Sequence, residues 1–179
     1  MDLHSKWRKN AYLGVFLAAA MICSYIETLI PFNFGIPGTK LGLANIIVLM
    51  MLYLVGIREA FFVSMVRVVL TGLLFGNIFS LVYSFSGAIL SFLVMVLLKK
   101  TGRLACVSIS TAGGVCHNMG QLLAAAFMIH DLHIMFYVPI LLFAGLATGL
   151  LMGILAQELV IRLDRFMRDH AWDSNKSLE

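Results

Sequence analysis

The apolar residues of the chain fall into six long runs, separated by short polar or glycine-containing segments. The runs are Ala11–Ile30, Leu41–Val55, Ile57–Phe75, Ile78–Leu98, Leu104–Ile129 and about Pro139–Ile161. A helix needs about 20 residues to cross the hydrocarbon core of a membrane, and most of the runs reach that length. The second run is shorter, and we expect a steeply bounded helix that begins within the preceding PGTKLG segment. The pattern predicts an all-α polytopic membrane protein, a bundle of six transmembrane helices.

The ends of the runs refine this prediction. Pro139 suits the first turn of the sixth helix, where its missing N–H costs nothing. The first run leads into PFNFG without a small-residue cleavage site, so we interpret it as a retained helix and not as a signal peptide. We predict a cytoplasmic N-terminus over residues 1–10, a transmembrane domain over 11–162 and a cytoplasmic tail over 163–179.

Composition supports the membrane prediction. Hydrophobic residues make up 61% of the 179 residues and charged residues 12%, whereas a soluble domain carries about a quarter charged residues. The length is that of one domain. Cys23, Cys106 and Cys116 lie in apolar stretches without metal-ligand spacing, so we expect them to be small buried residues.

The basic residues predict the orientation. They cluster at the N-terminus, at the Arg58 turn, in the KKTGR loop and in the C-terminal tail, whereas the opposite loops hold one Lys and no Arg. By the positive-inside rule both termini lie in the cytoplasm and the protein resides in the plasma membrane. The basic end of the last helix is expected to meet anionic lipid headgroups. No basic group is interleaved with aromatics as in nucleic-acid-binding domains, so we predict no nucleic-acid partner.

Arg67 is the one Lys or Arg deep inside an apolar run. A charge at membrane depth costs several kcal/mol, which makes a functional role the default interpretation. With an outer boundary near Phe75, Arg67 lies roughly 12 Å below it at the helical rise. Its planar guanidinium suits a carboxylate or a phosphate. The alternative is a structural ion pair with Glu27 at the outer end of the first helix.

Other polar residues fall at comparable depth, so that five helices contribute to the same half of the bundle. His117 and Gln121 are four residues apart, and Asn118 and Gln121 three apart, which places these three on one helical face. The predicted substrate-binding residues are Glu27, Lys40, Asn45, Arg67, Ser84, His117, Asn118 and Gln121. The alternatives are interhelical hydrogen bonds for Asn45, Ser84 and Ser86, a satisfied core position for His117, and an interfacial anchor for Lys40.

Small residues recur at helix-packing spacing. Gly145, Gly149 and Gly153 form one row, and Ala112, Cys116, Gly120 and Ala124 form another. We predict that both rows pack within the bundle, because small residues let helix backbones approach closely in lipid. On the first helix, Ala18, Ala19, Ala20 and Ser24 are a candidate docking face for another membrane protein.

Motifs of several enzyme classes are missing from the sequence. None of the aspartates forms a DDxxD-type pair, and clustered carboxylates are what Mg²⁺–diphosphate chemistry requires. There is no GxxxxGK[ST] loop, no GxSxG and no HExxH. Catalysis by this chain alone is therefore disfavoured, and we predict neither a metal nor another cofactor.

Three stretches resemble the Gx transporter family, which is often labelled heptaprenyl diphosphate synthase component I. They are IPGTKLGLANIIVLMMLYLVGIREAFFVSMVRVVLTGLLFGN, SFSGAILSFLVMVLLKK and GGVCHNMGQLLAAAF, and the likeness covers roughly Leu13–Gly153. The resemblance implies a six-helix bundle similar to the substrate-binding S components of energy-coupling factor (ECF) transporters. It also implies a ligand in the outer half, and small residues on the first helix that face a coupling subunit.

Two functions of different classes follow. Our first hypothesis is a substrate-binding membrane protein for uptake of a small polar or anionic molecule, with an ECF-type coupling subunit and ATPases as partners. The alternative is a membrane accessory component of heptaprenyl or other polyprenyl diphosphate synthesis that binds a prenyl diphosphate. A ligand-free scaffold would leave Arg67 paired only with Glu27.

Overall fold

The computed structural model describes the backbone of residues 3–29, 42–130 and 132–176. These residues form α1 (Leu3–Leu29), α2 (Leu43–Leu54), α3 (Ile57–Phe75), α4 (Ile78–Lys100), α5 (Cys106–Ile129) and α6 (Val138–Lys176). A short 3₁₀ helix, η1 (Leu132–Tyr137), precedes α6. No strand occurs in the described ranges, so the predicted all-α class is confirmed there.

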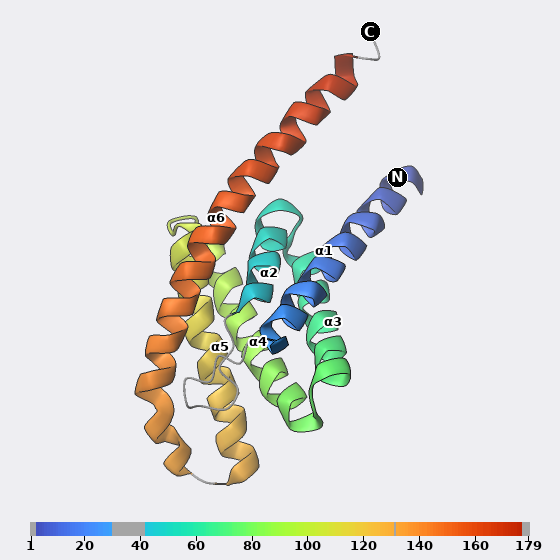
Figure 1. Ribbon diagram of the computed structural model, residues 1–179. Coiled ribbons are helices and arrows are strands. Elements are labelled where there is room, and N and C mark those ends of the chain that lie inside the picture. The colour runs from blue at the N-terminus through green and yellow to red at the C-terminus, as the bar shows by residue number, and fades with distance from the viewer. Residues whose placement is uncertain (1–2, 30–41, 131, 177–179) are drawn as a thin grey trace.

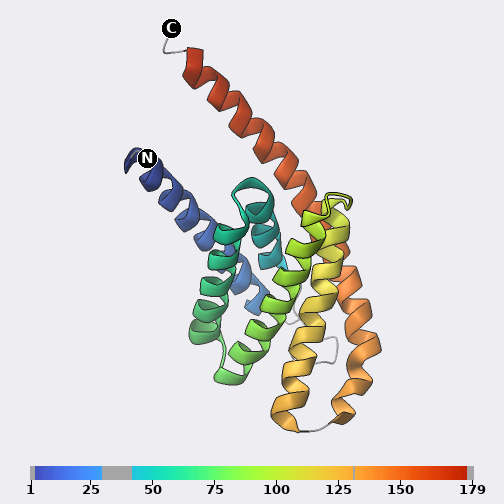
Figure 2. The same ribbon diagram turned by 180° about the vertical axis from the view of Figure 1, so that it is seen from behind.

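Helices α2 to α5 and the first part of α6 run roughly along one direction, and α1 crosses them obliquely (Figure 1). The α2–α3 turn and the α4–α5 loop lie at one end, and α1 and α6 extend beyond the bundle at that same end (Figures 1 and 2). The α3–α4 turn and the η1 segment lie at the opposite end. The fold therefore gathers the Arg58 turn, the KKTGR loop and the basic part of α6 on one side, as the charge pattern predicts.

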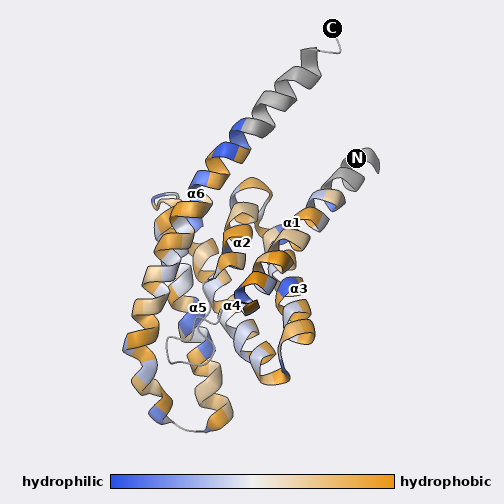
Figure 3. Cartoon of the chain, viewed as in Figure 1, coloured by the Kyte–Doolittle hydropathy of each residue, from blue (hydrophilic) through white to orange (hydrophobic). Residues whose placement is uncertain are grey.

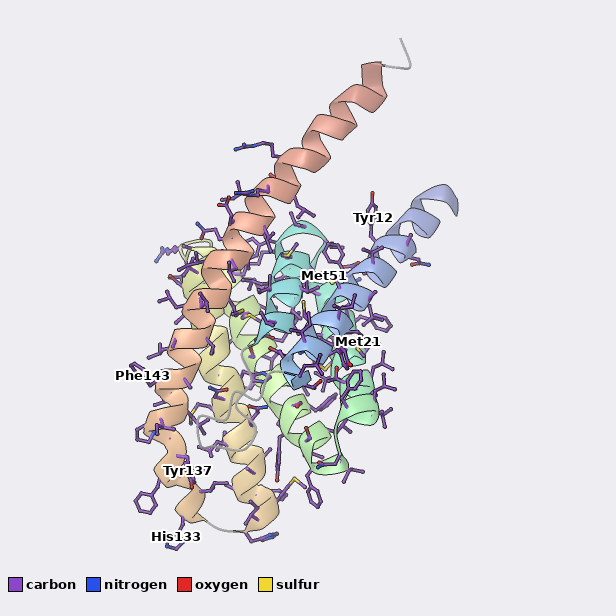
Figure 4. All side chains as sticks on the ribbon, viewed as in Figure 1. Tyr12, Met21, Met51, His133, Tyr137 and Phe143 are labelled. Carbon is purple, nitrogen blue, oxygen red and sulfur yellow. The ribbon has the colours of Figure 1, made fainter. Side chains whose placement is uncertain are left out.

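Three helices are long and apolar enough to cross a membrane, by length and composition. Among the described residues these are Asn10–Leu29, Ile78–Lys100 and His133–Arg165, and Leu43–Leu54 is a shorter apolar helix. Hydrophobic residues line the outward sides of α5 and α6 (Figure 3). Phe143 on α6 projects away from the bundle with 75% of its surface exposed (Figure 4). Exposed apolar surface of this kind is typical of a lipid-facing wall.

Local signals explain most helix boundaries. The bounds of α3 agree with the prediction, and α4 begins after Asn77, whose Oδ1 accepts a hydrogen bond from the Ser80 N–H at 2.8 Å. Such a side-chain cap satisfies a backbone donor that the first turn leaves open. Pro139 is the second residue of α6, as predicted, whereas η1 was not predicted. The helix α6 continues past the predicted run's end at Ile161, through the basic segment to Lys176.

The predicted start of the second helix within PGTKLG is wrong. The helix α2 begins at Leu43, and Gly42 before it adopts a left-handed conformation with φ 78°. Glycine accepts this conformation without the steric cost of a Cβ atom. With 12 residues, α2 is the shortest of the six helices in the described part of the chain.

The short helix α2 lies in the core. Its residues Val48, Leu49, Met51 and Leu52 are almost completely buried. They belong to an apolar cluster to which α3, α4, α5 and α6 contribute Val63, Phe92, Met95, Ile109 and Met152. An apolar helix of 10–14 residues is more often a buried core helix than a full membrane span. The core position therefore accounts for the length of α2.

Glycines bring α5 and α6 into backbone contact. A Cβ atom added to Gly145 would lie 2.8 Å from Val115 Cα, and one added to Gly149 would lie 2.8 Å from Thr111 Cα. The α6 row thus packs within the bundle, as predicted. In the second row, Gly120 also packs within the bundle, but against α4 and not α6: a Cβ added to Gly120 would lie 2.9 Å from Gly87 Cα.

Candidate functional site

A cavity of about 150 Å³ with both apolar and polar lining lies among the helices, and each of the six contributes to its lining. Hydroxyl-bearing residues are prominent: Ser24, Thr28, Thr71, Ser80, Ser84 and Thr148. Arg67, Asn45, His117 and Asn118 add a guanidinium, two amides and an imidazole. Such a cavity is suited to a small ligand with several hydrogen-bonding groups and a negative charge.

Arg67 on α3 is the buried cation of this cavity. Only 8% of its surface is exposed, and its Nη1 lies 3.4 Å from Ser24 Oγ on α1, to which it donates a long hydrogen bond. Among the described residues, its Nε has no hydrogen-bond partner. A buried guanidinium with an unused N–H group retains the capacity to bind an acceptor.

Glu27 near the end of α1 connects two parts of the site. Its Oε1 accepts a hydrogen bond from the backbone N–H of Leu43 at 2.5 Å, which ties α1 to the first residue of α2. Glu27 therefore contacts the helix start that borders the cavity, whereas its pairing with Arg67 stays a prediction.

Five of the eight predicted site residues line the cavity: Asn45, Arg67, Ser84, His117 and Asn118. Asn118 is 92% buried, and its Nδ2 donates a hydrogen bond to the Leu141 carbonyl of α6 at 2.9 Å. This contact gives Asn118 a structural role beside its place in the lining. Glu27 lies next to the cavity through its contact with Leu43, the residue after Gly42.

Gln121 and Lys40 differ from the others. Gln121 packs on α4, where its Cγ would lie 2.8 Å from a Cβ added to Gly87, and it is not among the described residues that line the cavity. The helical spacing that grouped it with His117 is correct, but the close approach of α4 covers that part of the face. Lys40 lies outside the described residues, and its proposed role stays a prediction.

The sequence-based prediction did not include several hydroxyl residues of the lining. Thr28, Thr71 and Ser80 each lie four residues from another lining residue, namely Ser24, Arg67 and Ser84. Residues four apart share one face of a helix. A search for hydroxyls one turn away from each predicted substrate-binding residue would have found Thr71 and Ser80, whereas Thr28 is one turn from Ser24, which was predicted for docking. Thr148 on α6 has no such neighbour among the predicted site residues.

The candidate docking row on α1 does not form one exposed face. Ala20 and Ser24 are buried within this chain, at 0% and 2% exposure, and Ala18 is exposed. Gly14, whose added Cβ would meet nothing within 4 Å, is exposed on α1 together with Ala11 and Ala18, and Ala19 is half-buried. Docking of a partner on α1 stays a prediction.

The fold and the cavity together describe an all-α protein with helices of membrane-spanning length around a buried, arginine-containing polar site. Residues 16–159 match the family described as heptaprenyl diphosphate synthase component I. The chain belongs to this family, and the matched range contains every residue that lines the cavity. No curated protein and no solved structure matches the chain.

Proposed function

We propose that the chain is a membrane component of polyprenyl diphosphate synthesis and that the Arg67 cavity holds the anionic head of a prenyl diphosphate. The observation that carries this proposal is the buried guanidinium with an unpartnered Nε in a hydroxyl-lined cavity. The family description supplies the isoprenoid context. In this function the protein is a multi-pass plasma-membrane protein with both termini in the cytoplasm.

The chemistry of the lining supports an oxyanion ligand. The fork of Arg67 can donate two parallel hydrogen bonds to phosphate oxygens, which a Lys ammonium cannot match in geometry. The Ser24 hydroxyl, and the Thr71 hydroxyl in place of its weak contact with Met21 Sδ, can donate to the remaining oxygens. The Thr28 and Thr148 hydroxyls already donate to the Tyr25 and Ala144 carbonyls. The prenyl tail would remain in the apolar environment outside the polar cavity.

Chain elongation itself is assigned to a partner. The sequence holds no DDxxD-type pair of aspartates, and Mg²⁺–diphosphate transfer depends on clustered carboxylate ligands. A family described as component I implies at least one further component of the synthase. We therefore propose that this chain binds or presents the isoprenoid while a partner subunit performs the transfer.

A second candidate function is uptake of a small polar or anionic molecule, in the manner of an ECF S component. It is favoured by the position of the cavity, which reaches the α3–α4 turn at the end of the bundle opposite the basic loops. In this function a coupling subunit with ATPases would supply the energy and would dock on α1.

Identification of the bound molecule separates the two candidates. The full chain is purified in mild detergent, and small molecules that co-purify with it are identified by mass spectrometry. A polyprenyl diphosphate supports the synthase component, and a water-soluble metabolite together with a coupling subunit and ATPases supports uptake.

Replacement of Arg67 tests the site in the synthase proposal. Binding of farnesyl diphosphate to Arg67→Ala should weaken at least about thirtyfold, because removing one partner of a buried charged contact costs roughly 2–5 kcal/mol. Arg58→Ala, which replaces an exposed arginine in the first turn of α3, is the matched control and should bind within about twofold of the wild type. Undiminished binding by a folded Arg67→Ala protein would refute the proposed site.

A further inference from the structure

The N-terminus of α2 borders the Arg67 cavity. Gly42, the residue before the helix, and Asn45 in its first turn both line the cavity. The first N–H groups of a helix have no partner inside the helix, and they carry a partial positive charge. A helix start in this position can therefore bind an anion.

This helix start is occupied by a carboxylate of the chain itself. Glu27 Oε1 lies 2.5 Å from Leu43 N, the first residue of α2. The internal anion thus takes one positive group of the site, the start of α2, beside the cavity that the Arg67 guanidinium lines.

Arg67 provides an independent sign that the site takes a further anion. Its side chain is more than nine-tenths buried, lines the cavity and has an Nε without a hydrogen-bond partner among the described residues. A buried N–H group without a hydrogen-bond partner costs free energy, and a hydrogen bond to a ligand oxygen would remove that cost. The site therefore has donor capacity that Glu27 does not use.

We propose that Glu27 is an internal competitor for the ligand, so that an anionic head binds by replacing its carboxylate at the start of α2. A diphosphate has two charged groups, and one would accept from the Leu43 N–H at the start of α2 while the other accepts from Arg67. This inference rests on the proposed anion-binding function of the cavity. Glu27 then weakens the affinity for the ligand and favours its release.

Glu27→Gln tests the competition directly. Glutamine keeps the length of the side chain and an oxygen that accepts from the Leu43 N–H, but it removes the negative charge. Affinity for inorganic diphosphate, measured by calorimetry on the full chain in detergent, should rise about tenfold. That factor corresponds to about 1.4 kcal/mol, a modest part of the interaction between neighbouring charges. Glu158→Gln, on the exposed part of α6, is the control and should leave the affinity unchanged.

The outcomes separate this inference from the proposed function. If Arg67→Ala binds inorganic diphosphate as well as the wild type, both the cavity site and the role of Glu27 are refuted. If Arg67→Ala loses binding while Glu27→Gln binds equally or more weakly, only the competition is refuted. If Glu27→Gln does not fold, Glu27→Asp replaces it as the test, because the shorter side chain draws the carboxylate back from Leu43. The Glu27→Asp protein should bind inorganic diphosphate about two- to threefold more tightly than the wild type, and unchanged or weaker binding overturns the proposal.

Discussion

The α5–α6 seam and the Arg67 cavity lie side by side but differ in how their helices meet. At the seam, glycines bring two backbones together, so that a Cβ added to Gly114 would lie 2.6 Å from the Gly145 carbonyl oxygen. Around the cavity, hydroxyl and amide side chains of six helices leave about 150 Å³ open. Asn118 belongs to both regions, because it lines the cavity and donates to the Leu141 carbonyl of α6.

The difference shows how a small bundle can combine rigid helix packing with an internal cavity. Close backbone packing replaces the hydrophobic drive that lipid removes, and it places α5 and α6 firmly against each other. Helices held in this way can support a cavity on their inner side without collapsing into it. We expect substitutions at the seam to change stability and substitutions in the lining to change binding.

The largest effect is expected from Gly149→Leu on α6. The new side chain would meet the backbone of α5 at Thr111 Cα and the Ser110 carbonyl, neither of which can move freely. We expect a loss of at least about 3 kcal/mol of stability, because overpacking forces backbone shifts. Thermal unfolding in detergent would show it as a midpoint lower by roughly 6–12 °C.

Gly14→Leu on α1 is the control for this prediction, since an added Cβ meets nothing within 4 Å there. Its midpoint should stay within about 2 °C of the wild type. Equal effects of the two substitutions would contradict the distinction between the seam and the open face of α1.

A moderate effect is expected from Asn118→Ala. The substitution removes the hydrogen bond to Leu141 and leaves a buried carbonyl without this donor, at a cost of about 1–3 kcal/mol. Asn45→Ala, in the lining at the start of α2, should cost under about 1 kcal/mol and act mainly on ligand binding. Thermal unfolding and binding of farnesyl diphosphate, measured on both proteins, decide whether stability and binding separate in this way.

A smaller effect is expected from Thr71→Val, which replaces a hydroxyl of the lining by a methyl group of similar size. The Thr71 hydroxyl is 3.7 Å from Met21 Sδ, a weak contact, so stability should change by less than about 1 kcal/mol. Affinity for farnesyl diphosphate should fall about three- to tenfold if the hydroxyl donates to the head. An unchanged affinity would exclude Thr71 from the contacts with the ligand.

The smallest effect on binding is expected from Gln121→Ala. Its side chain packs against Gly87 on α4 and does not reach the described lining. Affinity for farnesyl diphosphate should therefore remain within about twofold of the wild type. A tenfold loss would show that the face shared with His117 contacts the ligand, as the helical spacing alone suggests.

Much of the fold could be predicted from the sequence because its signals are local. Six apolar runs, interrupted by Gly56, Asn77 and the KKTGR loop, correspond to six helices, and the bounds of α3 agree residue for residue. The start of α2 was misplaced because the left-handed conformation of Gly42 stops the helix there. The 3₁₀ helix η1 was missed because a single apolar turn before Pro139 gives no periodicity of its own.

The residues of the candidate site were predicted in part, and the lining residues that the prediction left out share a common property. Arg67 stands out because an isolated charge in an apolar run is costly. Thr28, Thr71 and Thr148 carry no such signal, since a hydroxyl in a membrane helix can be satisfied by its own backbone, as the Thr148 hydroxyl is by the Ala144 carbonyl. Gln121 was included because spacing identifies a helical face but not the neighbour that covers it.

The sequence by itself determined the helices, the side on which the basic loops gather, and Arg67 as a buried charge, because each depends on residues close together in the chain. Only the tertiary structure decided which polar groups share one cavity and that Glu27 contacts the start of α2. It also decided that α2, the shortest helix, occupies the core. These features depend on how six helices approach one another, and close approach is set by side-chain volume and glycine contacts between distant segments.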